Sequence, residues 1–163
     1  MTATSGALPA ERSRAVRSIL WGGLIAGAID ITYACVFSYV RRSIPPARIL
    51  QSVASGALGQ AAFDGGMPTA ALGLLFHFLI ALIWAAVYYT ASRKLGVLAR
   101  VPYVFGVVYG LMIFAVMNYA VIPLSAAPFG APPPSSPAFN IGLLVHMLGI
   151  GLPIALATRR YSK

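Results

Sequence analysis

Charged residues are scarce in this chain, and acidic ones are scarcer still. Only 9% of the 163 residues are Asp, Glu, Lys or Arg, and only three residues are acidic. A soluble globular domain normally carries about 25% charged residues. Because 59% of the chain is hydrophobic and its mean hydropathy is +0.82, its surface would not be stable in water. We therefore expect lipid to be the solvent of this protein.

Cysteine and catalytic motifs are also nearly absent. The one cysteine, Cys35, lies inside an apolar run, where it cannot form an intrachain disulfide and serves as a small core residue. No G-x-S-x-G, H-E-x-x-H or glycine-rich phosphate loop is present, and no C-x-x-C-H haem attachment motif. Asp30 is the only acid well inside an apolar run, and Asp64 lies in a loop. A non-enzymatic protein is therefore expected.

What the chain does contain is four long apolar runs, at residues 19–40, 69–90, 101–123 and 138–158. Each is 21 to 23 residues long, and a helix needs about 20 to cross the hydrocarbon core. The competing interpretation of the first run is a signal peptide, but the run is too long and ends in Arg41-Arg42 without a small-residue cleavage site. The length of the chain allows one domain. The sequence predicts an all-α membrane domain at 19–158, a disordered basic tail at 1–18 and a short tail at 159–163.

The basic residues, which give a net charge of +9, are divided unequally between the two sides of such a bundle. If the four helices alternate in direction, nine Lys and Arg lie on the side of both termini and three on the other side. The positive-inside rule then places both termini in the cytoplasm. The same rule explains the short basic clusters better than nucleic-acid binding does. The clusters favour anionic lipid head groups as a partner, with charge that only sets the topology as the alternative. The nine are Arg12, Arg14, Arg17, Arg93, Lys94, Arg100, Arg159, Arg160 and Lys163.

The two loops on the outer side differ in character. Residues 47–62 form an amphipathic pattern, which predicts a short helix lying on or dipping into the outer interface. A re-entrant segment is the alternative. The second loop, at 124–137, has five prolines and no charge, so we expect an extended connector. The apolar stripe of the short helix consists of Ile49, Leu50, Val53, Ala57 and Ala61, with Gln51, Ser52, Ser55 and Gln60 mostly off it.

Two segments are nearly identical, GLLFHFL at 73–79 and GLLVHML at 142–148, and they contain the only two histidines. Helices one and three each carry a Gly-x-x-x-Gly pair as well. This order predicts two parallel helical hairpins related by a pseudo-two-fold axis along the membrane normal. Small residues let helix backbones approach closely, within one chain or in a homodimer. The candidate packing glycines are Gly23, Gly27, Gly73, Gly106, Gly110, Gly142 and Gly149.

Asp30, His77, His146 and Asn118 are the candidate polar cluster inside the bundle. Asp30 lies eleven residues into the first run, about 17 Å, and each histidine lies eight residues into its run, about 12 Å. In a hydrocarbon core about 30 Å thick, these three residues reach nearly the same level. Asn118 lies nearer the outer end. An ionised carboxylate facing lipid is costly, so Asp30 is expected to face the bundle interior, a cavity or a partner.

Several roles are open to this cluster. The histidines are able to donate hydrogen bonds across helix contacts, which is ordinary packing. An Asp–His group is able to relay protons, and buried titratable groups do mark transport pathways. His77 and His146 are also candidates for bis-imidazole haem ligation, and together with Asp30 for a non-haem metal. The leading expectation is a structural or stress-adaptation membrane protein without a cofactor.

Four strings carry a resemblance to a known family: ILQSVASGALG at 49–59, ALGLLFHFLIAL at 71–82, VMNYAVIPLSAAP at 116–128 and GLLVHMLGIGLPIAL at 142–156. They resemble the YagU-like family of small four-helix bacterial inner-membrane proteins. The resemblance covers most of the chain from the first helix to the fourth, leaves out residues 1–18 and covers the proline-rich loop only loosely. It implies a polytopic inner-membrane protein with no established reaction or cofactor.

Overall fold

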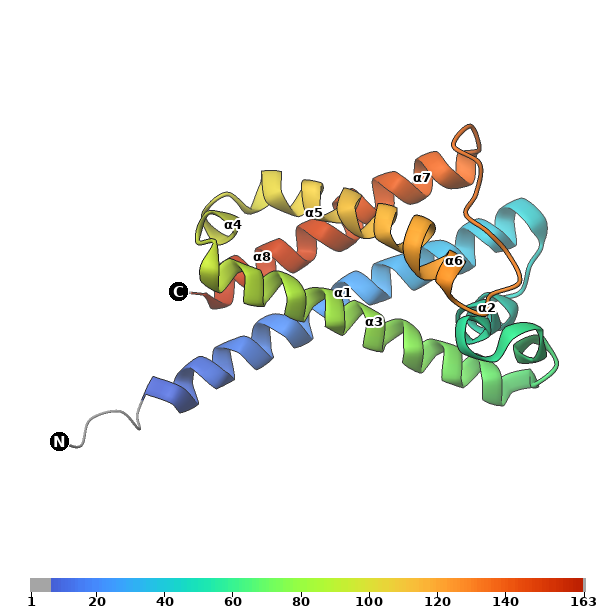
Figure 1. Cartoon of the computed structure of the whole chain (residues 1–163), viewed down its shortest axis with the longest axis horizontal. Helices are drawn as coiled ribbons and strands as arrows, with labels where there is room; N and C mark the ends of the chain where they lie inside the picture. The colour runs from blue at the N-terminus through green and yellow to red at the C-terminus, as the bar shows by residue number, and fades with distance from the viewer. Residues whose placement is uncertain (1–6, 163) are drawn as a thin grey trace.

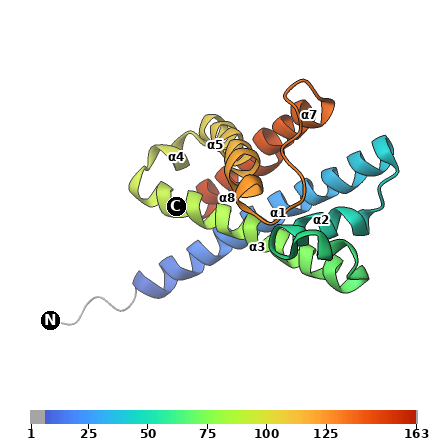
Figure 2. The same cartoon turned by 45° about the vertical axis from the view of Figure 1, so that its right-hand side comes forward.

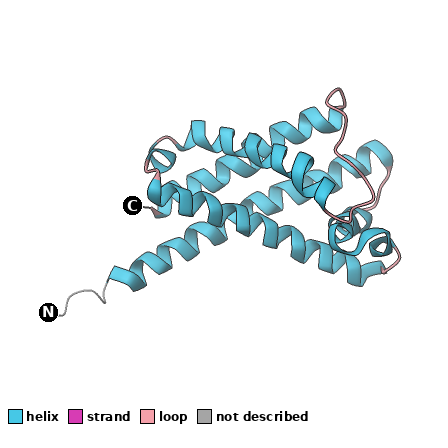
Figure 3. Ribbon diagram, viewed as in Figure 1, coloured by secondary structure: helices cyan, strands magenta, loops and turns pink. Residues whose placement is uncertain are grey.

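The computed structural model describes the backbone of residues 7–162 and the side chains of residues 11–162. Within that range every regular element is a helix, and no strand is present. Four helical segments are long and apolar enough to cross a membrane: Glu11–Arg42, Gly66–Lys94, Pro102–Leu124 and Pro137–Tyr161. In Figure 3, loops and short helical segments join them, and the loop before the fourth span is long. The predicted all-helical class and the four apolar spans are therefore present in the structure.

The first and second spans are single helices, α1 (Ala7–Arg42) and α3 (Gly66–Lys94). Between them lie α2 (Pro46–Leu58) and the 3-10 segment η1 (Gly59–Phe63). The short α4 (Val97–Arg100) follows α3. The third span consists of α5 (Pro102–Val116), the π-helical η2 (Met117–Val121) and α6 (Ile122–Leu124). The fourth consists of α7 (Pro137–Val145), the π-helical η3 (His146–Gly151) and α8 (Leu152–Tyr161).

The predicted disordered tail at 1–18 is wrong for the part that the structure describes, because residues 7–18 already belong to α1. Residues 1–6 lie outside the described range. Pro9 sits in the first turn, where its missing N–H costs no hydrogen bond, and the Glu, Arg and Ala residues that follow favour helix. The Oε1 atom of Glu11 also accepts a hydrogen bond from Arg93 Nη2 of α3 at 2.7 Å. At the other end, α8 continues through Tyr161, so the predicted 159–163 tail is helical up to that residue.

The four spans cross one another as a bundle with two distinct ends (Figure 1). Both α3 and α8 pack against α1, and α5 packs along η3 and α8. The start of α1, the end of α8 and α4 lie at one end, which we call the terminal end. Helix α2 and the 125–136 segment lie at the other, which we call the α2 end.

The Gly-x-x-x-Gly pair of α1 packs against α3. A Cβ at Gly23 would lie 2.8 Å from Leu82 Cδ2, and a Cβ at Gly27 would lie 2.9 Å from the Phe78 ring. Both distances are shorter than an ordinary carbon–carbon contact of about 3.5–4.0 Å. These two glycines therefore set how closely α1 and α3 approach.

The equivalent pair of α5 packs against the fourth span. A Cβ at Gly106 would lie 2.9 Å from Leu152 Cα, and a Cβ at Gly110 would overlap the backbone carbonyl of His146. Both Gly-x-x-x-Gly faces are therefore covered within one chain. A homodimer formed through either face, which the sequence allowed, is not compatible with this packing.

The remaining predicted packing glycines also lie at contacts between elements. A Cβ at Gly149 would lie 2.7 Å from Ile29 Cγ2 of α1, and one at Gly142 would lie 3.5 Å from the Phe114 ring of α5. One at Gly73 would overlap the Leu50 carbonyl oxygen of α2.

Helix α2 is present where an amphipathic helix was expected, but its orientation corrects the prediction. Its buried residues are Gln51, Ala54 and Ser55, whereas Ala57 of the predicted apolar stripe is exposed, as is the neighbouring Leu58. The small and polar face thus packs inward, because only small side chains allow the close backbone approach at Gly73 of α3.

Two polar contacts fix α2 over this end of the bundle. Gln51 Nε2 donates to the Gly66 carbonyl at 2.9 Å, and the Ala126 N–H donates to the Gly56 carbonyl at 2.9 Å. Gly73 lies seven residues into α3, so α2 packs about 10 Å below the start of that helix. Figure 2 shows α2 beside the first turns of α3, with the 125–136 segment running from α2 up to α7.

The two π-helical segments have a common cause. Pro123 and Pro153 each stand two residues beyond the end of a segment. A proline lacks the N–H for the i−4 carbonyl, and its ring would collide with that carbonyl. Near the start of each segment, a side chain also binds the carbonyl four residues earlier: Asn118 in η2 and His146 in η3. Widening the helix by one residue relieves both conflicts, and π-bulges of this kind are frequent at functional sites.

Candidate functional site

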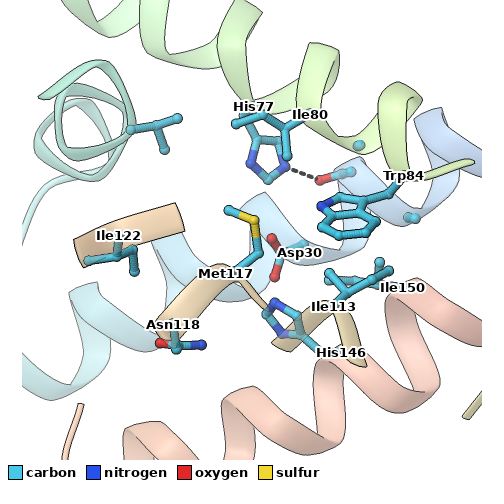
Figure 4. A pocket seen from close by; sticks show the side chains of 14 residues that line it. Asp30, His77, Ile80, Trp84, Ile113, Met117, Asn118, Ile122, His146 and Ile150 are labelled. Atoms are coloured by element: carbon cyan, nitrogen blue, oxygen red, sulfur yellow. Dashed lines mark hydrogen bonds between the residues drawn. The ribbon is translucent and has the colours of Figure 1, made fainter. Parts of the chain in front are cut away.

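A cavity of about 260 Å³ lies within the bundle, and all four spans and α2 contribute to its wall. Its wall includes all four residues of the predicted polar cluster: Asp30 of α1, His77 of α3, Asn118 of η2 and His146 of η3. The two imidazoles enter from opposite sides, and Asp30 enters between them (Figure 4). The other lining residues are apolar, so the polar groups meet among apolar side chains.

His77 is held by a hydrogen bond across the α1–α3 contact. Its Nε2 lies 2.9 Å from the Gly27 carbonyl oxygen. Because a carbonyl oxygen only accepts, this nitrogen carries the hydrogen. In the neutral ring, Nδ1 is therefore the lone-pair nitrogen. A Cβ at Gly27 would meet the Phe78 ring, so this glycine lets α1 and α3 approach closely where the imidazole reaches the backbone of α1.

His146 is held differently, by its own helix. Its Nδ1 lies 2.9 Å from the Gly142 carbonyl oxygen, so Nδ1 donates and Nε2 keeps the lone pair. The edge of the imidazole also meets the Phe114 ring, with centroids 5.1 Å apart and planes at 81°. The two similar histidine segments therefore place their imidazoles with opposite tautomers and on different partners.

Asn118 is buried, and its Nδ2 donates to the Phe114 carbonyl at 2.9 Å. Asp30 is half-buried and stands apart from these pairings: within residues 11–162, no hydrogen bond or ion pair to its carboxylate is present. A carboxylate in the interior of a membrane bundle normally has a partner. Asp30 is thus the one residue of the cluster whose side chain has no hydrogen-bonding partner among the described residues.

On the side of the cavity toward the terminal end, the last lining residue of α3 is Trp84, and other aromatic residues pack against it. Tyr109 of α5 donates its hydroxyl hydrogen to the Trp84 carbonyl of α3 at 2.7 Å. Its ring packs edge-on against Trp84 and against Tyr88, with centroids 6.1 Å and 4.8 Å away. At the other end, Val53 of α2 and Ile122 of α6 complete the wall. The sequence did not predict that Trp84, Val53 or Ile122 would line a cavity, since such a residue in an apolar run is indistinguishable from any other core residue.

The geometry does not favour the metal alternatives. Among residues 11–162, no three His, Cys, Asp or Glu side chains are close enough together to hold a metal ion. The predicted three-ligand set of Asp30, His77 and His146 is therefore not formed. A haem macrocycle is at least as large as a drug-sized ligand, which occupies about 300–1,000 Å³, more than this cavity offers. The side chain of Met117 also enters the cavity from η2 near Asp30 (Figure 4).

No family model, curated protein sequence or solved structure matches the chain. The resemblance to the YagU-like proteins therefore stays a prediction.

Proposed function

We propose that this protein is a proton-conducting membrane module in which Asp30, His77 and His146 accept and release protons inside the cavity. The observation that carries the proposal is Asp30, an acid without a hydrogen-bonding partner in the described bundle interior. Keeping such a group in lipid is costly, and intramembrane ionisable residues mark ion and proton pathways. A merely structural carboxylate would be expected to have a donor within reach.

The histidines are suited to the same task. Each uses one nitrogen to hold its position on a backbone carbonyl, so its second nitrogen is free to take up a proton. Imidazole is the side chain whose ordinary pKa lies closest to physiological pH. Asp30 lies between the two rings and would stabilise whichever imidazole is protonated (Figure 4). On this proposal the Tyr109–Trp84 contact is the barrier to conduction toward the terminal end, because Trp84 lines the cavity and Tyr109 packs against it.

The proposal includes the setting of the module. We place it in a bacterial inner membrane with both termini in the cytoplasm, supported by the nine-to-three division of basic residues. Membership of the YagU-like family is part of the same proposal. So is a parallel hairpin repeat, although the different hydrogen bonds of His77 and His146 show that any such repeat has diverged at the cavity.

The test is proton flux into liposomes that hold the purified protein and a pH-sensitive dye. We expect flux above that of empty liposomes, reduced to background by Asp30→Asn, which removes the titratable group and keeps the shape. Asp64→Asn is the matched control, because Asp64 is an exposed loop acid outside the cavity. Flux that is equal to empty liposomes for the wild type, or unchanged in Asp30→Asn, would refute the proposal.

A structural role is the second candidate, favoured by a different observation. The His77 hydrogen bond to Gly27 joins α1 to α3 at the position where Gly27 also packs against Phe78. On this alternative the cluster fixes helix packing, and the protein is a structural or stress-adaptation component of the membrane. It predicts that Asp30→Asn and His77→Ala change thermal stability while neither changes proton flux.

A further inference from the structure

A second concavity, at the terminal end of the bundle, is lined by three arginines from three separate elements. Arg93 comes from the last turn of α3, Arg100 from α4 and Arg159 from the last turn of α8. The space has a volume of about 530 Å³, and no acidic residue lines it. The other lining residues are Ser92, Gly96, Ala99 and Ser162.

The arginines meet there because α4 folds back between two helix ends. Gly96 begins a tight turn after α3, and α4 then packs against the end of α8. Cations at helix C-termini interact favourably with the partial negative charge of the last carbonyls. That interaction explains why a basic residue is tolerated at each helix end. It does not explain why three guanidinium groups surround one recess.

The charge in this recess is only partly compensated. Arg93 forms an ion pair with Glu11, and both side chains are about half exposed. Within residues 11–162, Arg100 and Arg159 have no ion pair. The Ser162 hydroxyl oxygen is buried without any hydrogen-bonding partner among the described residues, and Ser162 lines the same recess. Two guanidinium groups and one hydroxyl thus have donors available for an anion.

The surroundings of the recess are those of a lipid head group. Arg93 and Arg159 stand near the ends of helices long enough to span a membrane, and Arg100 lies in the connection beside them. This is the level of lipid phosphates. Beside them in the 95–101 segment, Leu95, Val97 and Val101 are exposed apolar side chains that acyl chains would cover. Basic pockets between spanning helices bind anionic lipids in this way, and arginine matches phosphate oxygens through its planar fork.

We propose that this recess is a specific site for an anionic phospholipid, whose phosphodiester is bound by Arg100, Arg159 and the Ser162 hydroxyl. The site is independent of the proton-conducting function proposed above. It differs from a general attraction of the basic termini to the membrane, because it depends on these residues and not on their neighbours of equal charge.

The test is the thermal unfolding midpoint of the detergent-solubilised protein, with and without added lipid. Phosphatidylglycerol should raise the midpoint by roughly 5–10 °C when its concentration is about a hundredfold above Kd. Phosphatidylcholine, which has a phosphodiester but no net charge, should have little effect. Arg159→Gln and Arg100→Gln should each remove most of the shift, with every variant compared with its own lipid-free midpoint.

Arg160→Gln is the matched control, because Arg160 is the next residue of the same helix end and does not line the recess. It should keep the full shift. Loss of the shift in Arg160→Gln, or its full retention in both Arg100→Gln and Arg159→Gln, would show that binding is non-specific and overturn the proposal. An equal shift with inorganic phosphate alone would overturn the lipid as the ligand. Native mass spectrometry that counts bound phosphatidylglycerol provides the second measurement.

Discussion

Gly110 is the position at which the packing of the bundle is most directly testable. It lies in the Gly-x-x-x-Gly pair of α5, against the start of η3. A Cβ there would overlap the His146 carbonyl oxygen and lie 2.6 Å from Met147 Cα. Both obstacles are backbone atoms, so no rotamer change relieves the clash. Gly110→Ala must therefore push α5 and η3 apart.

The size of the effect follows from that overlap. Carbon atoms in contact are about 3.5–4.0 Å apart, so the two helices must separate by roughly 1 Å. Overpacking of this kind costs about 1–3 kcal/mol of the free energy of unfolding. Since 1.4 kcal/mol is a factor of ten, the ratio of folded to unfolded protein should fall about 5- to 140-fold. In thermal terms, the midpoint should fall by roughly 2–12 °C for a chain of this size.

The assay is thermal unfolding in detergent, followed by tryptophan fluorescence, with Gly56→Ala as the control. A Cβ at Gly56 of α2 would lie 3.8 Å from Ser125 Cβ, an ordinary contact. Replacing a helical glycine by alanine gains about 0.5–1 kcal/mol in helix propensity, so the control should be equal to the wild type or more stable. If Gly110→Ala is also as stable as the wild type, α5 does not rest backbone-to-backbone on η3 and the packing argument is refuted.

Two further predictions concern the cavity. Tyr109→Phe removes the hydroxyl that binds the Trp84 carbonyl. It should lower the free energy of unfolding by about 0.5–1.5 kcal/mol and raise proton flux. If neither quantity changes, Tyr109 is not the barrier to proton flux. His77→Ala should destabilise the protein more than His146→Ala, because only the His77 bond joins two helices; equal losses in chemical unfolding would contradict that difference.

The coarse architecture was accessible from hydropathy alone. Four runs of about twenty apolar residues predict four spans, since a helix is the segment that satisfies its own backbone groups in lipid. The observed helices extend beyond the predicted runs, for example to Lys94 at the end of α3, because helix propensity continues past the hydrophobic limit. The same reasoning failed at residues 7–18, where a basic composition was taken for disorder although those residues form helix.

For the polar cluster, the sequence predicted which residues come together but not which partners they bind. Depth along each helix was enough to predict that Asp30, His77 and His146 would lie at one level, and all three line one cavity. The partner of each group was not predictable. His77 and His146 occupy nearly identical segments, yet one binds a neighbouring helix and the other its own, because the ring environment depends on which helix passes alongside.

The predicted orientation of α2 was wrong for a related reason. Its apolar stripe was expected to face the hydrophobic interface and its polar residues to lie away from it. In a membrane bundle, inward surfaces need small residues for close packing rather than apolar ones for burial, so Gln51, Ala54 and Ser55 face the protein. Sequence amphipathicity therefore does not identify the inner face when both sides are apolar.

By itself, the sequence determined that this chain is helical, that four segments are long and apolar enough to span a membrane, and that Asp30, His77 and His146 stand well inside those segments. These properties depend on local composition and on the rise per residue. Only the tertiary structure decided which glycine faces which helix, which carbonyl each histidine binds, and that Asp30 is left without a partner. Those features depend on which segments, far apart in the chain, lie side by side, because the neighbouring segment decides whether a side chain finds a partner there, in its own helix or not at all.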